Sequence, residues 1–438
     1  MTEEYKNPWS PQDEREHFPC PLEWWCAILF FKTIEDEKRW SLKGSFSEWA
    51  EGDEEDGSVY DVTLFDLDND KHYTYGSKKE KEKLTTVKDS CLHVKYDDSW
   101  IRGAYPDYEI YFHDKKNNIK VNLKYHAESI PRWVAQDTTG GWLPMGLGFY
   151  RYGFIPKNKV TGNIEINGKK YNLEGQGYFE HVWGDIWYDK PLSNYSQIKK
   201  TFSIYKKLAT WWIKHHKLTI PDTMMFSTEN NAFGYDWIWG LLDNGWMLFY
   251  GNILFWIMQG YSTGALVFSK DGKKYTEFPD IHFKYNKLQY MEKYDYYYPT
   301  EIELVAKHKN ETLDLKFIMT NTSREFISLF TKPDYWLGFI ICEIPGRIEG
   351  YYSDGKEKIN LTGVCKIEPQ RQVSITGHNS IRVDFLKPPK GFGIDVIINS
   401  HYLMKNIATK LQFAPKPLFK VKVKRLKKEN FPTVDKLN

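Results

Sequence analysis

The chain lacks several features that would assign it to a common class. Its 438 residues include only 5 cysteines, an odd number without a disulfide framework or a zinc signature, which favours a reducing compartment. The most apolar stretch, WMLFYGNILFWIM at 246–258, is too short to span a bilayer and contains Asn252. The N-terminus is polar and acidic, unlike a secretory signal or a transit peptide. We therefore expect a cytoplasmic protein.

Charge and motifs exclude further classes. The net charge of +2 gives little support for a nucleic-acid partner. The sequence has no Gly-x-Ser-x-Gly, phosphate loop or dinucleotide fingerprint, which disfavours hydrolases, kinases and dehydrogenases. His181, His215 and His216 do not form a recognised ligand spacing, so neither a metal nor a cofactor is expected.

Aromatic residues, by contrast, are abundant. The 17 Trp, 30 Tyr and 26 Phe make up 17% of the chain. Chains this rich in aromatics often line a cavity or sit at a membrane interface, and the sequence leaves both uses open. The length exceeds the size at which one hydrophobic core stops growing, so two domains are expected.

Strand patterns dominate the chain. A run of β-branched and aromatic residues, a turn of Asp, Asn, Gly and Lys, and a second such run recur at 58–76, 108–127, 162–181, 264–278 and 301–319. Hairpin after hairpin with few helical patterns between them predicts an all-β protein of barrels or sandwiches.

Two hairpins also resemble each other. GKKYNLEGQGYFE (168–180) and GKEKINLTGVCKIE (355–368) both begin with Gly-Lys, pass through Asn-Leu and end in Gly-x-x-x-x-Glu. That ending runs from Gly175 to Glu180 in the first copy and from Gly363 to Glu368 in the second. The repeat predicts two related barrels in tandem, although short hairpins also match by chance.

One segment breaks the strand pattern. IKKTFSIYKKLATWWIKHHK (198–217) holds six Lys and no acid, and on a helix these lysines fall within an arc of roughly 120°. The segment predicts an amphipathic helix, either packed on a barrel with its lysines in water or attached to an anionic membrane surface. In the second case the helix would be peripheral at the inner membrane surface. The membrane contacts would be Lys199, Lys200, Lys206, Lys207, Trp211 and Trp212.

Three short clusters are candidates for chemistry: PCPLEWWCAILFF at 19–31, with Glu23 before two tryptophans, GQGYFEHVWGD at 175–185 and FGYDWIWGLLDNGW at 233–246. Strand alternation places Tyr178 and Glu180 on one face and His181 and Trp183 on the other. Glu180 and His181 would then share a pocket only if the strand ended or bulged there. In the third cluster alternation separates Asp236 from three aromatic residues that share a face: Tyr235, Trp237 and Trp239.

In this order the clusters resemble the carotenoid hydratase family, whose superfamily of tandem lipocalin-like barrels takes in kievitone hydratase-like proteins and fungal Diels-Alderases. Its first barrel typically ends in Gly-x-Gly-Tyr-x-Asp/Glu-His-x-Trp-Gly. The matching residues are Gly175, Gly177, Tyr178, Glu180, His181, Trp183 and Gly184, and Asp236 and Trp237 match the Asp-Trp that opens the second barrel. The resemblance runs from about His17 to Phe419. It implies a barrel over 17–195 and a second barrel over 221–419. The helical segment over 196–220 is an insertion relative to the family pattern, and a basic tail follows over 420–438.

The resemblance also implies a chemistry. In the hydratases an Asp or Glu protonates a terminal isoprenoid alkene, and water captures the cation. A carboxyl in an apolar cavity has a raised pKa and stays protonated, which suits this use. We expect Glu180 to be the acid in a barrel cavity, with His181 orienting it or activating water. The expected ligand contacts are Glu23, Trp24, Trp25, Tyr178, Trp183, Asp185, Tyr235, Asp236, Trp237 and Trp239.

The resulting hypothesis is an acid-catalysed hydratase or cyclase acting on a hydrophobic, isoprenoid-like or polyketide-like alkene. The alternative is a non-catalytic lipid or isoprenoid carrier or sensor that uses the basic helix to reach membranes. The family motif is specific for the fold and weak for the reaction, because members hydrate, cyclise or only bind.

Overall fold

The computed structural model describes most of the chain. The described residues are 8–17, 20–49, 57–80, 82–86, 92–145, 148–185, 195–215, 223–227, 234–251, 257–258, 261–262, 264–291, 296–320, 326–330, 338–373, 380–386, 393–399 and 419–424. His216, Lys217, Asn252 and the last residues of the basic tail lie outside these ranges.

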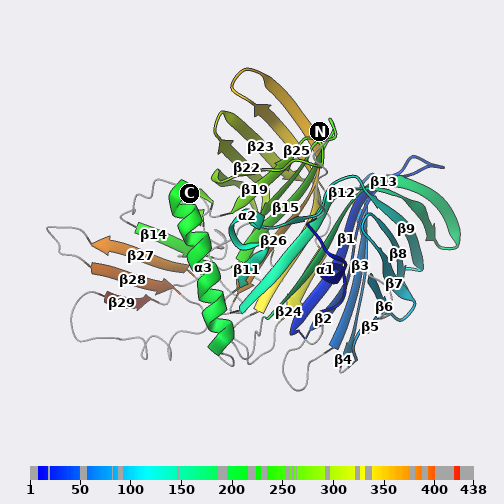
Figure 1. Ribbon diagram of the computed structural model, residues 1–438, viewed down its shortest axis with the longest axis horizontal. Coiled ribbons are helices and arrows are strands. Elements are labelled where there is room, and N and C mark those ends of the chain that lie inside the picture. Colours follow the sequence, from blue (N-terminus) through cyan, green and yellow to red (C-terminus); the bar gives the residue numbers. More distant parts are fainter. Residues whose placement is uncertain are drawn as a thin grey trace.

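Two curled antiparallel sheets make up most of the molecule (Figure 1). The first has 13 strands: β1 (Leu22–Thr33), β2 (Arg39–Trp49), β3 (Gly57–Asp66), β4 (Lys71–Glu80), β5 (Thr85–Thr86), β6 (Leu92–Tyr96), β7 (Ser99–Ala104), β8 (Asp107–Asp114), β9 (Ile119–Ala127), β10 (Arg132–Trp133), β11 (Trp142–Met145), β12 (Gly148–Ile166) and β13 (Lys169–Asp185).

The second sheet has 12 strands: β15 (Gly234–Leu242), β16 (Met247–Gly251), β17 (Ile257–Met258), β18 (Tyr261–Ser262), β19 (Ala265–Ser269), β20 (Thr276–Phe278), β21 (Asp280–Met291), β22 (Tyr296–His308), β23 (Glu311–Met319), β24 (Phe326–Phe330), β25 (Gly338–Ser353) and β26 (Lys358–Val373). Each sheet curls into a half-barrel (Figure 1), which confirms the predicted all-β fold with tandem barrels. The five predicted hairpins are all present, as β3–β4, β8–β9, β12–β13, β19–β20 and β22–β23.

The two sheets have the same strand order. The path β4-β3-β2-β1-β13-β12-β9-β8-β7-β6-β5 matches β20-β19-β16-β15-β26-β25-β23-β22-β21-β18-β17 strand for strand. The repeated glycines occupy equivalent places: a Cβ on Gly175 would lie 2.2 Å from the carbonyl oxygen of Phe30, and one on Gly363 would lie 2.1 Å from that of Leu241. Only glycine allows this close approach of backbones. The topology therefore supports an internal duplication.

Three helices and a small third sheet complete the described structure. The helices are α1 (Pro11–Glu14), α2 (Gln136–Thr139) and α3 (Tyr195–His215), and α3 is the predicted amphipathic helix. The third sheet is β14 (Thr223–Ser227), β27 (Ser380–Leu386), β28 (Gly393–Asn399) and β29 (Phe419–Lys424), with β28 and β29 parallel. In Figure 1 this sheet lies on the far side of α3 from the half-barrels. This third sheet was not predicted from the sequence.

Three hydrophobic clusters show where the buried faces lie. One fills the concave side of the first sheet, and a second fills that of the second sheet. The third combines alternate residues of β1, β12 and β13 with alternate residues of β15, β16 and β19. The two half-barrels are thus joined through a shared buried layer, which we call the inter-sheet layer.

Candidate active site

The two faces of β13 lead to different environments. Tyr178 and Val182 belong to the inter-sheet layer, and Glu180 lies on the same face between them. Phe179 and Trp183 belong to the core of the first half-barrel, on the face that also carries His181. This confirms the alternation predicted from sequence. The expected acid therefore lies between the two half-barrels and not inside the first one.

Three side chains hold the Glu180 carboxyl. Trp24 of β1 donates its indole Nε1–H to Oε1 at 2.8 Å. Tyr178 donates its hydroxyl to Oε2 at 2.8 Å, and Tyr152 of β12 makes a short hydrogen bond to the same oxygen. The two tyrosine hydroxyls are also 3.0 Å apart. Glu180 Oε2 and the two phenol oxygens therefore form a closed ring of three contacts.

The protons available to this ring favour a neutral carboxyl. An ionised Glu180 leaves only two hydroxyl protons for three oxygen–oxygen contacts, so one contact would join two acceptors. A protonated Glu180 supplies the third proton, and each oxygen then donates one hydrogen bond and accepts one. Burial also raises the pKa of Glu180, although the hydrogen bonds from Tyr152, Trp24 and Tyr178 oppose this. Geometry and burial both point to a glutamic acid that keeps its proton.

Aromatic rings surround this carboxyl. The ring of Tyr178 meets that of Trp237 edge-on at 5.3 Å, and Tyr152 meets Phe249 edge-on at 5.8 Å. Trp237 and Phe249 come from the second sheet, so both halves contribute walls. Glu180 and Tyr152 each keep 8% of their surface exposed, whereas Tyr178 is fully buried.

The second half of the chain repeats part of this arrangement. Glu368 on β26 aligns with Glu180 in the repeat, and it accepts a hydrogen bond from the hydroxyl of Tyr235 on β15. The two donors occupy equivalent positions on their strands. Each lies two residues before the residue that pairs with the glutamate: Trp24 on β1 for Glu180, and Tyr235 on β15 for Glu368. Each half thus sends one glutamate and its own aromatic donor into the layer. Burial, followed by the charges of Glu343 and Glu180, raises the pKa of Glu368 to about 8.

Further charged groups are buried close by. Lys43 binds Asp61, at 2.8 Å to Oδ1, within the first sheet. On the second sheet Glu343 and Lys366 are almost completely buried, and the described residues offer no hydrogen-bond partner to either carboxylate oxygen or to the amine. Burial raises the pKa of Glu343 and lowers that of Lys366 to about 8. The inter-sheet layer is therefore a strip of titratable groups walled by aromatic rings.

A pocket opens elsewhere in this layer. Its volume is about 650 Å³, and its lining includes Phe30 and Gln176 of the first sheet and Leu241 and Val364 of the second. This size suits a small organic ligand. Gln176 is four residues from Glu180, or about 13 Å along the strand. None of the residues expected to contact a ligand lines this pocket.

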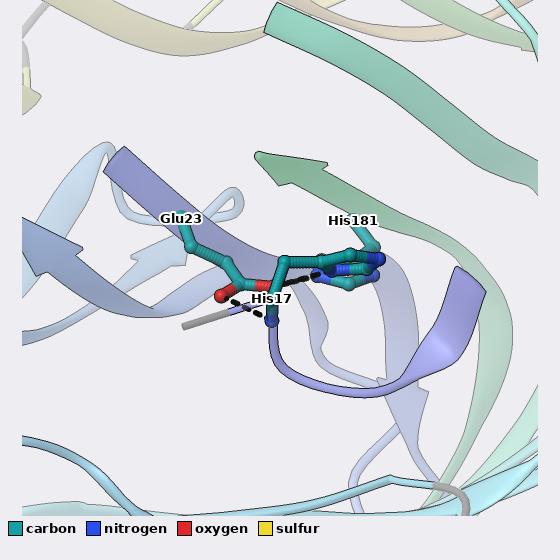
Figure 2. A group of neighbouring side chains, drawn as sticks. All are labelled: His17, Glu23 and His181. Atoms are coloured by element: carbon teal, nitrogen blue, oxygen red, sulfur yellow. Dashed lines mark hydrogen bonds and ion pairs between the residues drawn. The ribbon is translucent and has the colours of Figure 1, made fainter. Parts of the chain in front are cut away.

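His181 belongs to a separate cluster in the first half-barrel (Figure 2). Its Nε2 is 2.8 Å from Oε1 of Glu23, and its Nδ1 is 2.8 Å from the carbonyl oxygen of Asp13. His17 contacts the same Glu23 oxygen through Nδ1 at 2.9 Å. Burial acts to raise the pKa of Glu23, but the hydrogen bonds of His17 and His181 outweigh it and lower that pKa. Burial lowers the pKa of His181.

The expectation that His181 orients Glu180 is therefore wrong. Both ring nitrogens of His181 are engaged by Glu23 and Asp13, on the opposite face of β13. The strand continues through this point to Asp185, so the bulge that would have united the two side chains does not occur there.

The remaining expected ligand contacts divide among three environments. Glu23, Trp25, Trp183 and Asp185 lie on the concave face of the first sheet, and Trp25 stacks on His181 at 4.6 Å. Trp239 joins the inter-sheet layer with Tyr235 and Trp237. Asp236 is fully buried and accepts the hydroxyl of Tyr285 at 2.5 Å on the concave face of the second sheet. The ten residues do not line one pocket.

Helix α3 packs against β11 and β12 and shows a mixed outer surface. Lys199, Lys200, Lys206 and Lys207 are exposed, as predicted, and Lys200 lies 3.6 Å from the centroid of the Trp142 ring. Trp211 is half-buried and Trp212 is buried, at 6% exposure, so the placing of Trp212 at a membrane surface is wrong.

Two apolar residues of α3 face outward instead. Phe202 is 58% exposed and Ile213 is 54% exposed. No helix among the described residues has the length and apolarity to cross a membrane.

Several residues of the site were missed from sequence. Tyr152, Glu343 and Lys366 sit in ordinary strand patterns and carried no signal. Glu368 did carry one, because the repeat aligns it with Glu180.

Comparison with known proteins identifies the fold. No protein-family model matches the chain, and no curated protein matches it in sequence. A candidate AttH protein from Nitrosomonas europaea has a similar structure, with 14% identity and a TM-score of 0.56 over 85% of this chain and 98% of that one. Kievitone hydratase from Nectria haematococca has 10% identity and a TM-score of 0.54 over 84% of this chain and 94% of that one. The resemblance predicted from the motifs is confirmed as a shared fold.

Proposed function

We propose that this chain, which has the tandem half-barrel fold of the carotenoid hydratase-like lipocalins, is an acid-catalysed hydratase or cyclase of a hydrophobic, isoprenoid-like alkene. The observation that carries the proposal is the three-membered ring of Glu180, Tyr152 and Tyr178, which is complete only when the carboxyl holds a proton. A buried neutral carboxyl is the group that acid catalysis of this kind requires.

The proposed reaction begins with proton transfer from Glu180 to one alkene carbon. The alkene's π electrons form the new C–H bond, the neighbouring carbon becomes a tertiary cation, and the carboxyl becomes a carboxylate. The hydroxyls of Tyr152 and Tyr178 and the indole N–H of Trp24 then all point at that carboxylate and stabilise its charge.

The cation is then captured. In a hydration, water adds to the cation and its proton returns to Glu180. In a cyclisation, a second double bond of the substrate attacks, and loss of a proton to Glu180 restores the acid. The faces of the aromatic rings nearby, including Trp24 and Trp237, would stabilise the cation meanwhile. Access of water to the layer decides between these outcomes.

Deuterium provides a direct test. The protein would be incubated in D₂O with a panel of acyclic isoprenoid alkenes, farnesol, squalene and lycopene, and products would be analysed by mass spectrometry. Wild-type protein is expected to place deuterium on carbon. Glu180→Gln removes the acidic proton and is expected to slow this step at least about a hundredfold, the usual scale of a general acid's contribution. Glu349→Gln, an exposed change on β25 that does not line the pocket, is the matched control.

Ligand binding separates chemistry from folding. Glu180→Gln should bind the alkene as tightly as wild type, because the amide keeps the shape of the carboxyl. Deuteration by Glu180→Gln at the wild-type rate would refute the assignment of Glu180 as the acid.

A second candidate function is transport of the same class of ligand without turnover. The exposed lysines of α3 and the outward-facing Phe202 and Ile213 favour it, because basic and apolar residues together suit an anionic lipid surface. Alkene binding by wild-type protein without any deuteration would favour the carrier over the enzyme.

A further inference from the structure

Two imidazoles and one carboxylate converge at the mouth of the first half-barrel (Figure 2). His17 comes from the segment after α1, Glu23 from the start of β1 and His181 from β13. One potential ligand atom from each lies within 4.8 Å of the others. Two His and one Glu make up the protein ligands of several catalytic zinc sites, in which the fourth position stays open.

The hydrogen-bond pattern leaves a place for a cation between His181 and Glu23. A backbone carbonyl can only accept, so the contact with Asp13 places the ring proton of neutral His181 on Nδ1. Its Nε2 then presents a lone pair to Glu23 Oε1 at 2.8 Å. Glu23 is oriented as an acceptor, because the backbone N–H of His17 donates to both of its oxygens. Two acceptors face each other, and either a proton or a metal ion must bridge them.

The surroundings hold the rings in the orientation that a metal needs. The carbonyl of Asp13 fixes the tautomer of His181, which is the usual outer-shell support of a metal-bound histidine. Trp25 stacks on His181 at 4.6 Å, and Trp183 stacks on His17 at 3.8 Å and 5°. Glu23 and His181 are almost fully buried, and a shared metal ion would take a lone pair from each of these two facing acceptors.

We propose that His17, Glu23 and His181 form a binding site for a divalent transition-metal ion of the zinc class. Zinc binds nitrogen and oxygen at about 2.0–2.1 Å, so the donors must separate by roughly half an ångström from their present contacts. His17 is the one free to move, since its side chain is 24% exposed on an irregular segment.

The site would fasten the N-terminal segment to the first sheet. Residues of that segment already contact the first sheet, among them Trp9 against Trp133 at 5.7 Å and Asp13 against Arg151 at 2.7 Å. A metal bound by His17 adds a bond between this segment and two central strands.

Metal uptake tests the proposal without any substrate. Protein freed of metal by dialysis against EDTA would be titrated with Co²⁺, followed by its visible absorption, and then with Zn²⁺ in competition. We expect one equivalent of Co²⁺ with a tetrahedral spectrum that Zn²⁺ displaces. His17→Ala and Glu23→Gln should weaken uptake by at least about tenfold, the smallest effect usual for loss of metal-site contacts. His126→Ala, which changes an exposed histidine bound to Asp107, is the matched control.

Two results would overturn the proposal: wild-type protein that takes up no stoichiometric metal, or His17→Ala protein that binds Co²⁺ as wild type does. A proton would then be the bridging cation. Circular dichroism on each variant separates loss of the site from loss of the fold. Because His17 is partly exposed, its variant keeps the test valid should Glu23→Gln not fold.

Discussion

Glu368 allows a quantitative check of the inter-sheet layer. Its folded-state pKa is raised from 4.5 to about 8, first by burial and then by the neighbouring charges of Glu343 and Glu180. A raised pKa means that the folded chain holds this proton more tightly than the unfolded chain. The stability that the proton contributes is therefore full below pH 4.5 and is lost as the pH rises to about 8.

The size of the effect follows from this window. Each pH unit between the two pKa values costs about 1.4 kcal/mol, so at pH 7 the carboxyl destabilises the fold by about 3 kcal/mol relative to pH 4.5. Partial exposure of the side chain makes this an upper figure. Glu368→Gln needs no proton and keeps an oxygen for the hydroxyl of Tyr235. We expect the variant to be more stable than wild type by 1 to about 3 kcal/mol at pH 7, and by less than about 1 kcal/mol at pH 5.

Urea unfolding at pH 5, 6, 7 and 8 measures this difference, and Glu174→Gln controls for the loss of one exposed negative charge. The gain from Glu368→Gln should grow with pH across the series, while the control stays flat. A gain that is constant with pH, or largest at pH 5, would refute the assignment of a protonated Glu368.

Two further predictions concern α3. Trp212→Ala should lower stability by about 3–5 kcal/mol because the ring is buried, whereas Phe202→Ala should change it by less than about 0.5 kcal/mol; urea unfolding of both variants checks the orientation of the helix. Reversing Lys199, Lys206 and Lys207 to Glu should abolish co-sedimentation with anionic phosphatidylserine liposomes if α3 is the membrane contact, and unchanged co-sedimentation would exclude that role.

The local features of the fold could be predicted from sequence. Hairpins follow from turn residues between alternating runs, and these patterns need no knowledge of distant partners. Strand geometry alone predicts that Tyr178, Glu180 and Val182 lie on one face of their strand. It places His181 and Trp183 on the other face. The repeat could be recognised in the sequence because the fold requires glycine at both Gly175 and Gly363, where a neighbouring strand comes close.

The rest depended on contacts between distant segments. Alternation assigns Glu180 to one face of its strand but does not say what covers that face. We therefore expected Glu180 in a barrel cavity, whereas the structure places it in the layer between the two sheets. His17 lies 164 residues from His181 along the chain. No ligand spacing in the sequence connects them, because the N-terminal segment approaches β13 only in the folded chain. Helix α3 has about its predicted length. It carries more apolar residues, however, than the face that contacts β11 and β12 can bury.

Duplication itself explains why an acid arises in this layer. Two related halves that meet through the same face bring Glu180 and Glu368 into one low-dielectric space, where each raises the other's cost of ionisation. The halves then diverge in the hydrogen bonds that each carboxyl receives: Glu180 has Trp24, Tyr152 and Tyr178, while Glu368 has Tyr235. Glu180 receives more hydrogen bonds than Glu368, so its carboxylate is the one that can give up a proton and take it back. An isolated half would supply one glutamate and half of the aromatic wall, so the proposed chemistry belongs to the junction of the two halves.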